Sequence, residues 1–239
     1  VRTELLDPAA RRTSVINEFG PPASAEDWHA LQADALLEAK HASTICVCGS
    51  LPAGSPINAF RTLIAALRDT GKPVWADTSG AALDAALMPG VNIKISHDEA
   101  AELLGTPIET AEETAQATEE LSRRIGGAKA IITMSARGAA GRDDTGVWQV
   151  SAAKTDVVST LGCGDSFLAG LLVAFERGDN MADALKQASA AGTANALSIG
   201  GGRFTARLTR NICSSTSRLG VSRSISRRRK SSGVQGLTV

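Results

Sequence analysis

Residues 159–170 read Ser-Thr-Leu-Gly-Cys-Gly-Asp-Ser-Phe-Leu-Ala-Gly, a glycine-rich turn that runs into an apolar helical pattern. Such a turn exposes backbone N–H groups at a helix N-terminus, and these groups attract anions together with the helix dipole. Asp165 stands in the first helical turn, where an acid often only complements the dipole. Beside a bound anion, it could accept a proton from a substrate hydroxyl. The turn alone fits both an ordinary helix start and a phosphoryl-transfer site.

On both sides of this turn, the hydrophobic pattern alternates between strands and helices. It predicts strands at 44–48, 72–76, 91–95 and 130–134, and helices at 25–40, 56–70, 97–104, 111–125, 165–177 and 181–197. This alternation indicates βαβ units in a mainly parallel sheet. Residues 146–150 indicate an antiparallel excursion, and the runs 3–6 and 13–17 indicate a hairpin. The predicted fold is a three-layer α/β/α domain with a small β lid.

Polar loops follow four of the predicted strands, at residues 49–54, 77–80, 96–99 and 135–138. Ligands of open α/β sheets bind at the carboxyl ends of the strands. We therefore expect these four loops to share one rim and to form the binding site with the 159–170 turn.

Composition narrows the functional classes. Aromatic residues make up 3% of the 239 residues, which favours a layered α/β protein over a β-sandwich. No apolar run reaches the roughly 18 residues of a membrane span, and the first residues show no signal-peptide pattern, so a cytoplasmic protein without a membrane partner is expected. Cys46 and Cys48 lie in an apolar run without zinc-type spacing and are expected to be reduced core thiols.

Charge is divided unevenly along the chain. All 25 acidic residues lie at or before Asp183, whereas nine of the 25 basic residues lie from Arg203 onward. Residues 207–239 are rich in Ser and Arg and show no periodicity, so a disordered tail is predicted. A shifted reading frame would explain the abrupt change. A basic arm for nucleic acid is the less favoured alternative, and it is the only feature that indicates a nucleic-acid partner.

The 159–170 turn resembles the signature of the ribokinase-like, PfkB-type carbohydrate kinases, in the branch of 1-phosphofructokinases and tagatose-6-phosphate kinases. Segments 17–21, 48–54, 77–80 and 191–196 resemble further motifs of this branch in the same order. Cys163 stands where the family has Ala, and only its backbone N–H is needed there. The resemblance covers about residues 2–206, and implies a kinase domain at 1–206 with residues 1–20 in the lid.

The resemblance implies ATP and Mg²⁺ as cofactors, with Asp165 as catalytic base and the N–H groups of Gly162, Cys163 and Gly164 holding the transferred group. It implies that Glu99 helps to hold Mg²⁺ through water and that Arg2 contacts the phosphate of the substrate. A monovalent cation such as K⁺ would bind the Ser159 and Leu161 carbonyls. The implied nucleotide-binding residues are Lys94, Ser96, Thr133, Ser135, Gly138, Gly164 and Asn195.

Two positions depart from the family pattern. Ser96 replaces an Asn of the metal–phosphate network, and Ser135 replaces a Gly of the nucleotide loop. If position 135 needs a positive φ, Ser fits it poorly and ATP binding should weaken. The residues alone also allow simpler interpretations, with Glu99 as a solvated acid at a helix start and residues 133–138 as a plain strand-to-turn junction.

The implied reaction is phosphorylation of a sugar phosphate, with fructose 1-phosphate as first choice and tagatose 6-phosphate, fructose 6-phosphate or a nucleoside as alternatives. The family's N-terminal sugar-binding motifs do not appear, so we expect an N-terminally truncated chain with weak activity. A non-catalytic nucleotide-binding remnant is the alternative outside enzymes. A homodimer formed through the lid is a further expectation.

Overall fold

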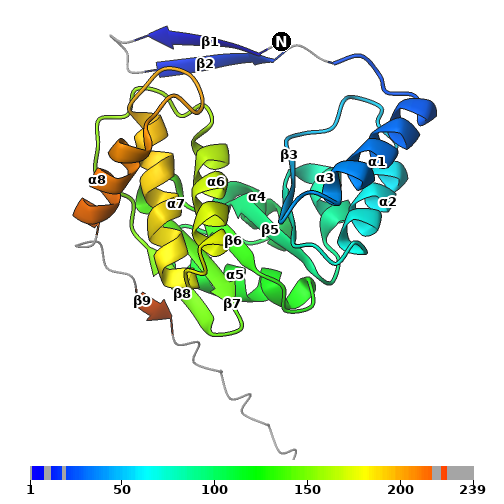
Figure 1. Cartoon of the computed structure of the whole chain (residues 1–239). Coiled ribbons are helices and arrows are strands. Elements are labelled where there is room, and N and C mark those ends of the chain that lie inside the picture. Colours follow the sequence, from blue (N-terminus) through cyan, green and yellow to red (C-terminus); the bar gives the residue numbers. More distant parts are fainter. Residues whose placement is uncertain (1, 8–11, 18–19, 217–221, 225–239) are drawn as a thin grey trace, which may run out of the picture.

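The computed structural model describes residues 2–7, 12–17, 20–216 and 222–224. Within these residues, seven strands form the main sheet in the order β3-β4-β5-β6-β7-β8-β9, and β1 pairs with β2 in a separate hairpin (Figure 1). The strands are β1 (Arg2–Asp7), β2 (Arg12–Asn17), β3 (Ile45–Cys48), β4 (Val74–Asp77), β5 (Val91–Ser96), β6 (Ala130–Thr133), β7 (Ala139–Asp143), β8 (Gly146–Val150) and β9 (Ser222–Ser224). β3 to β6 run parallel, and β7, β8 and β9 are added antiparallel.

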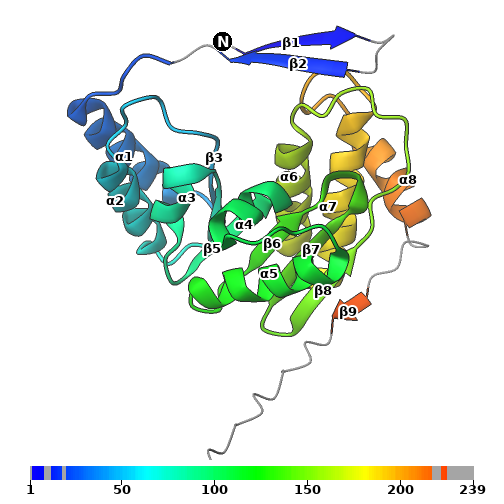
Figure 2. The ribbon, with the colours of Figure 1, turned by 180° about the vertical axis from the view of Figure 1, so that it is seen from behind.

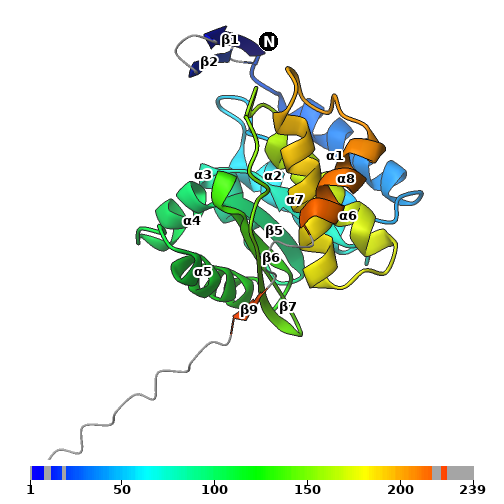
Figure 3. The ribbon, with the colours of Figure 1, turned by 90° about the vertical axis from the view of Figure 1, so that its left-hand side faces the viewer.

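Helices cover both faces of the main sheet, which gives the predicted α/β/α layers (Figure 3). The helices are α1 (Ala25–Ala39), α2 (Ile57–Arg68), α3 (Gly80–Ala86), α4 (His97–Leu104), α5 (Ala111–Arg124), α6 (Cys163–Glu176), α7 (Met181–Ala196) and α8 (Ala206–Thr216), with a 3₁₀ turn at Ser135–Arg137. The predicted elements agree with these bounds to within about two residues at nearly every end.

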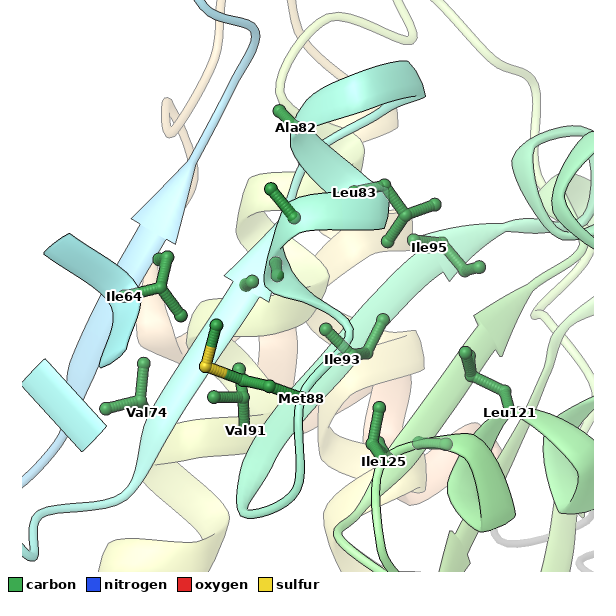
Figure 4. Packing of buried hydrophobic residues seen from close by; sticks show 14 of the residues in the cluster. Ile64, Val74, Ala82, Leu83, Met88, Val91, Ile93, Ile95, Leu121 and Ile125 are labelled. Atoms are coloured by element: carbon green, nitrogen blue, oxygen red, sulfur yellow. The ribbon is translucent and has the colours of Figure 1, made fainter. Parts of the chain in front are cut away.

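Side-chain alternation along the strands divides the interior into two cores. Ile93 and Ile95 of β5 face the helices α2 to α5 and lie in one buried cluster with Leu83 and Leu121 (Figure 4). Trp75 of β4 faces the opposite way, into a second cluster with α6 and α7. Because the side chains of a strand alternate between the two faces of the sheet, each polar residue at a strand end also points to one particular face. This alternation determines which polar side chains meet at the strand ends.

Side-chain caps begin several of the helices. Ser24, Ser96 and Thr110 each accept a hydrogen bond from the backbone N–H three residues later, in a complete capping box. Each such cap satisfies an N–H that the helix leaves without a partner, and typically contributes about 1 kcal/mol. The Ser24 cap confirms the predicted start of α1. On this helix, Trp28 is buried in the core, whereas Leu31 is 49% exposed.

Strand β3 corrects a prediction. A buried strand with core thiols was expected, but Cys46 and Cys48 are exposed, while Ile45 and Val47 pack against the core. The reason is the position of β3 at the edge of the seven-stranded sheet. Ile45 and Val47 point to the face that packs against a core cluster, whereas Cys46 and Cys48 point to the opposite face of this edge strand.

Helix α8 corrects a second prediction. Disorder was predicted from residue 207 onward, but Ala206–Thr216 is helical and packs on α7, and Ser222–Ser224 pairs with β8. Thr209 is buried, and Leu208, Ile212 and Cys213 are partly buried, so these four positions share one face of the helix. Their spacing is an amphipathic signal within the Ser/Arg-rich sequence. Residues 217–221 and 225–239 lie outside the described residues.

The antiparallel pairing of β1 and β2 confirms the predicted hairpin, which lies apart from the main sheet (Figure 2). Arg2 begins β1 and pairs with Asn17, but its side chain lies outside the described part of the structure. No helix in the described ranges has the length and apolar character that a membrane crossing would need.

Candidate functional site

Two cavities lie along the carboxyl-end rim of the sheet, and Gly164 lines both of them. The larger has a volume of about 540 Å³ and the smaller about 240 Å³. The larger is lined by Thr133, Ser135, Ala136, Gly138, residues 152–155, Val157, Thr160, Cys163, Gly164, Phe167, Ser189, Gly192, Thr193 and Ala196. The smaller is lined by Gly49, Ser50, Asp77, Thr78, Ser79, Lys94, Glu99, Gly162, Gly164 and Asp165.

The turn at residues 162–165 separates the two cavities. Gly162 has a φ of +73° and serves as N-cap of α6, and a side chain there would meet the Cα of Gly201 at 2.9 Å. Only glycine fits both demands. The N–H of Gly164 has no acceptor among the described residues, whereas the N–H of Cys163 donates to the Thr160 carbonyl at 3.2 Å. Of the three predicted N–H donors to the transferred group, that of Cys163 therefore already has an acceptor within the protein.

Asp165 is exposed and lines the smaller cavity. Within the described ranges, no hydrogen bond or ion pair engages its carboxylate. A carboxylate without a partner at an anion-binding helix N-terminus can accept a proton from a hydroxyl held beside it. This is the geometry that the sequence predicts for a catalytic base.

Asn195 supports the turn from behind. It is fully buried, its amide donates to the Leu161 carbonyl at 2.6 Å, and its side-chain oxygen accepts from the N–H of Gly202 at 2.7 Å. It lines neither cavity, and its contact with the nucleotide stays a prediction. The Leu161 carbonyl, a predicted K⁺ ligand, thus has one acceptor site already occupied, and the Ser159 carbonyl lies 3.7 Å from the Cys163 thiol.

Lys94 and Asp77 form a buried ion pair at the floor of the smaller cavity. Lys94 Nζ lies 2.6 Å from Asp77 Oδ2, and the two side chains are 6% and 15% exposed. Burial raises the pKa of Asp77; the Lys94 ammonium opposes this, whereas Glu99 and Asp165 add to it. Lys94 therefore lines the smaller, acidic cavity, and its contact with the nucleotide stays a prediction.

Sequence patterns assigned no role to Asp77 or Thr78. Thr78 is 4% exposed and lines the smaller cavity, and its hydroxyl oxygen is buried without a partner among the described residues. A buried hydroxyl without a partner is costly unless a ligand completes it. The motif at residues 77–80 places both residues at the end of a strand on the rim, and this is the signal that could have identified them.

Ser96 and Glu99 bond to each other. Glu99 Oε2 accepts from the Ser96 N–H at 2.7 Å and from its hydroxyl at 2.9 Å, while the Ser96 hydroxyl accepts from the Glu99 N–H at 3.2 Å. Ser96 lines neither cavity and its hydroxyl caps α4, so its contact with the nucleotide stays a prediction. Glu99 faces the smaller cavity.

The described residues contain no cluster of three or more His, Cys, Asp or Glu side chains that could hold a metal by themselves. Glu99 can offer a metal ion one oxygen, Oε1, because its Oε2 accepts hydrogen bonds from Ser96. This fits Mg²⁺, which commonly keeps several waters and is held by one or two carboxylates together with substrate phosphates.

The loop at residues 133–138 contains two residues with a positive φ, Ser135 and Gly138. Ser135 has a φ of +53°, the only positive φ of a non-glycine residue within the described ranges. Gly138 has a φ of +112°, and a Cβ there would overlap the Val150 carbonyl oxygen. Thr133 and Ser135, which are predicted to bind the nucleotide, both line the larger cavity, and the Thr133 hydroxyl donates to the Ile95 carbonyl at 3.3 Å. Lys154, Phe167 and Thr193 line it without having been predicted.

Comparison with known proteins gives consistent results. The family model described as pfkB family carbohydrate kinase matches residues 4–206. The chain is 34% identical over 178 residues to 1-phosphofructokinase of Haemophilus influenzae, and the match covers 73% of this chain and 56% of that protein. The chain thus spans little more than half the length of this relative.

Two solved structures share the fold. Phosphofructokinase-2 from Escherichia coli, in complex with potassium, is similar with a TM-score of 0.81 at 23% identity, over 91% of this chain and 71% of that chain. Arabidopsis thaliana ribokinase, complexed with ribose and ATP, is similar with a TM-score of 0.67 at 19% identity, over 89% of this chain and 68% of that chain. At these identities, the likeness concerns the fold alone.

Proposed function

The chain belongs to the pfkB family of carbohydrate kinases, and we propose that it transfers the γ-phosphoryl group of MgATP to a hydroxyl of a sugar phosphate. The observation that carries this proposal is the position of Gly164, which lines both cavities at the N-terminus of α6. A nucleotide in the larger cavity would direct its last phosphate to this turn. An acceptor in the smaller cavity would meet that phosphate from the other side, beside Asp165.

The roles of the residues follow from this arrangement. Asp165 takes the proton of the acceptor hydroxyl as the hydroxyl oxygen attacks the γ-phosphorus. The N–H of Gly164 and the positive end of α6 stabilise the charge on the transferred group. Thr78 offers its unpartnered hydroxyl to the acceptor. Mg²⁺, when bound, neutralises phosphate charge, and Glu99 would hold it through water.

Fructose 1-phosphate is the proposed acceptor, because the Haemophilus influenzae relative is named 1-phosphofructokinase. Tagatose 6-phosphate is the alternative within the same branch. Arg2, in the lid, is proposed to contact the phosphate that the acceptor already carries.

Potassium is a proposed further cofactor, supported by the Escherichia coli phosphofructokinase-2 structure that contains it. The Ser159 carbonyl and the remaining acceptor site of the Leu161 carbonyl would bind it. Activity in potassium chloride should exceed activity in tetramethylammonium chloride at equal ionic strength.

A lid-mediated dimer is proposed as the partner arrangement. Leu5 and Ile16 are 53% and 54% exposed, and the register of the hairpin places them on one face. Replacing both by Ser should shift the chain toward monomer in light scattering, while an unchanged mass would contradict a lid interface.

The central test is a coupled ADP-release assay on this chain, with fructose 1-phosphate and tagatose 6-phosphate in parallel and titration calorimetry for nucleotide binding. Turnover that depends on fructose 1-phosphate would support the proposal. Nucleotide binding without turnover on either acceptor would favour a non-catalytic nucleotide-binding protein, in line with the strained Ser135.

A further inference from the structure

We propose that Asp77 is a positioning residue, which holds the ammonium of Lys94 at the N-terminus of α6 so that the site distinguishes a nucleoside triphosphate from a diphosphate. This inference rests on the proposed function, because it assumes that a nucleotide occupies the larger cavity. It assigns a role to a residue that acts through another side chain and not by touching the reacting atoms.

The strand register brings Asp77 and Lys94 together. Ala76 of β4 pairs with Ile93 of β5 in a parallel ladder, so the next residue of each strand lies side by side on the same face. That face is the one covered by α6 and α7, since Trp75 packs there. The resulting ion pair, at 2.6 Å, therefore lies beneath the N-terminus of α6.

Lys94 reaches the point where the two cavities join. A Cβ added to Gly164 would lie 2.9 Å from Lys94 Nζ. A third phosphate that extends from the larger cavity to this turn comes within reach of the ammonium, whereas a diphosphate ends one phosphate earlier. The absence of a side chain at position 164 leaves this approach open.

The smaller cavity offers Lys94 competing partners. Among its described lining residues, Lys94 is the only cation, and it shares the cavity with Asp77, Glu99 and Asp165. Cys48 of β3 also lies within electrostatic reach of Lys94. A buried ammonium without a partner is costly, so Lys94 must pair with one of these acids.

Asp77 decides which acid Lys94 pairs with. The ion pair with Asp77 leaves the carboxylate of Asp165 without a partner in the described structure. Without Asp77, the flexible lysine stem would let the ammonium turn to Glu99 or Asp165. It would then leave the phosphate position, and an Asp165 carboxylate paired with it would be a weaker proton acceptor.

A double-mutant cycle separates this role from a structural one. The variants are Asp77→Asn, Lys94→Met and the combination of the two, with Glu119→Gln as control because Glu119 forms an ion pair with Arg142 away from both cavities. Calorimetry measures the affinities of ADP and of a non-hydrolysable ATP analogue, so the readout does not need turnover. Thermal unfolding checks that each variant folds.

We expect Asp77→Asn and Lys94→Met each to lower the ratio of triphosphate to diphosphate affinity by about tenfold, the scale of one lost charge-assisted hydrogen bond. The double variant should show no larger loss than Lys94→Met alone, because Asp77 acts only through Lys94. ADP affinity should change little, and Glu119→Gln should keep the wild-type ratio.

An unchanged ratio in Asp77→Asn, or losses that add in the double variant, would overturn the inference. If Asp77→Asn fails to fold, the double variant Asp77→Leu/Lys94→Met serves in its place, because it removes both charges of the pair. We expect it to fold and to show the same ratio of triphosphate to diphosphate affinity as Lys94→Met. A lower ratio than in Lys94→Met would refute the proposal. If the affinity ratios change as expected but no phosphoryl transfer is detected, the kinase function would be overturned and the inference would stand. Failure to bind either nucleotide would overturn both.

Discussion

The two cavities that meet at Gly164 are built on different physical principles. The larger is lined mainly by small residues and backbone, with Lys154 as its only charged side chain among the described residues, and it depends on special backbone geometry at Ser135 and Gly138. The smaller has less than half the volume and contains three carboxylates and one ammonium. Shape therefore controls the first cavity and charge controls the second.

This difference predicts which substitutions are tolerated in each cavity. Added volume should damage the larger cavity, whereas changes of charge at constant volume should damage the smaller one. The four predictions below test the contrast, from the largest expected effect to the smallest.

Asp165→Asn keeps the volume of the smaller cavity and removes a charge. We expect turnover to fall by about 10²–10⁴-fold, the usual contribution of a general base, with nucleotide affinity nearly unchanged. The coupled ADP-release assay and calorimetry measure the two quantities. A loss below about tenfold, which is smaller than the bottom of that range, would contradict the role of Asp165 as base.

Cys48 reports the negative field of the smaller cavity. Cys48 is an exposed residue, but the atoms around its sulfur partly desolvate the thiol. This desolvation, followed by the charges of Asp77, Cys46 and Asp165, raises the pKa of the thiol to about 12, while Lys94 opposes the shift. A raised pKa leaves less thiolate at neutral pH, although the thiolate that does form is more nucleophilic. Taking both effects together, we expect alkylation of Cys48 by iodoacetamide to be about 10²-fold slower than that of a free thiol with a pKa near 8.5. Peptide mass mapping over time measures the rate.

Removing a nearby acid should sharpen this result. Asp165→Asn should speed labelling of Cys48, because one of the charges that disfavour the thiolate is lost. Labelling as fast as that of glutathione in the wild-type chain would contradict the proposed field.

Gly138→Ala tests the larger cavity by volume. The added Cβ would overlap the Val150 carbonyl, and a φ of +112° strains any residue that carries a side chain. We expect nucleotide affinity to fall by about tenfold and the free energy of unfolding by about 1–3 kcal/mol. Gly178→Ala serves as control for a positive φ, because its added Cβ meets nothing within 4 Å. Equal effects of both substitutions on nucleotide affinity would refute a specific role of Gly138.

Ile212→Asn tests the support behind the larger cavity, with the smallest expected effect. α8 packs on α7, and α7 contributes Ser189, Gly192 and Thr193 to the cavity wall. Placing a polar group on the partly buried face of α8 should lower the free energy of unfolding by about 1–2 kcal/mol and change nucleotide affinity little. Asn211→Gln serves as control, because Asn211 is the exposed neighbour of Ile212. Equal thermal stability of the Ile212→Asn and Asn211→Gln variants would argue against a packed α8.

Local sequence signals predicted the features that depend on neighbouring residues. The alternation of strands and helices, the hairpin, the Ser24 cap and the bounds of α4 all follow from periodicity and capping chemistry within a few residues. The glycine turn at 162–165 was also readable, because glycine patterns encode backbone geometry directly. The positive φ at Ser135 was considered only as a condition, because the resembling family has Gly at this position. The family assignment confirmed by residues 4–206 rested on these short motifs.

Local signals failed where the neighbours come from distant parts of the chain. An apolar pattern at 45–48 is the same for a central strand and an edge strand, so the exposure of Cys46 and Cys48 depends on which elements cover β3. The amphipathic face of α8 was hidden in a Ser/Arg-rich composition, and it is stabilised by packing on α7.

The sequence by itself determined the order of the elements and the glycine turn, and its resemblance to the kinase family indicated Asp165 as the candidate base, because each signal is encoded within a short continuous segment. Tertiary structure alone decided that Asn195 supports the turn from behind, that Ser96 serves as a helix cap, and that Lys94 pairs with Asp77 and leaves Asp165 free. The physical reason is that an ion pair or a cavity wall depends on strand register and on the face to which each side chain points. Those relations join residues far apart in the chain, and only the folded sheet brings them together.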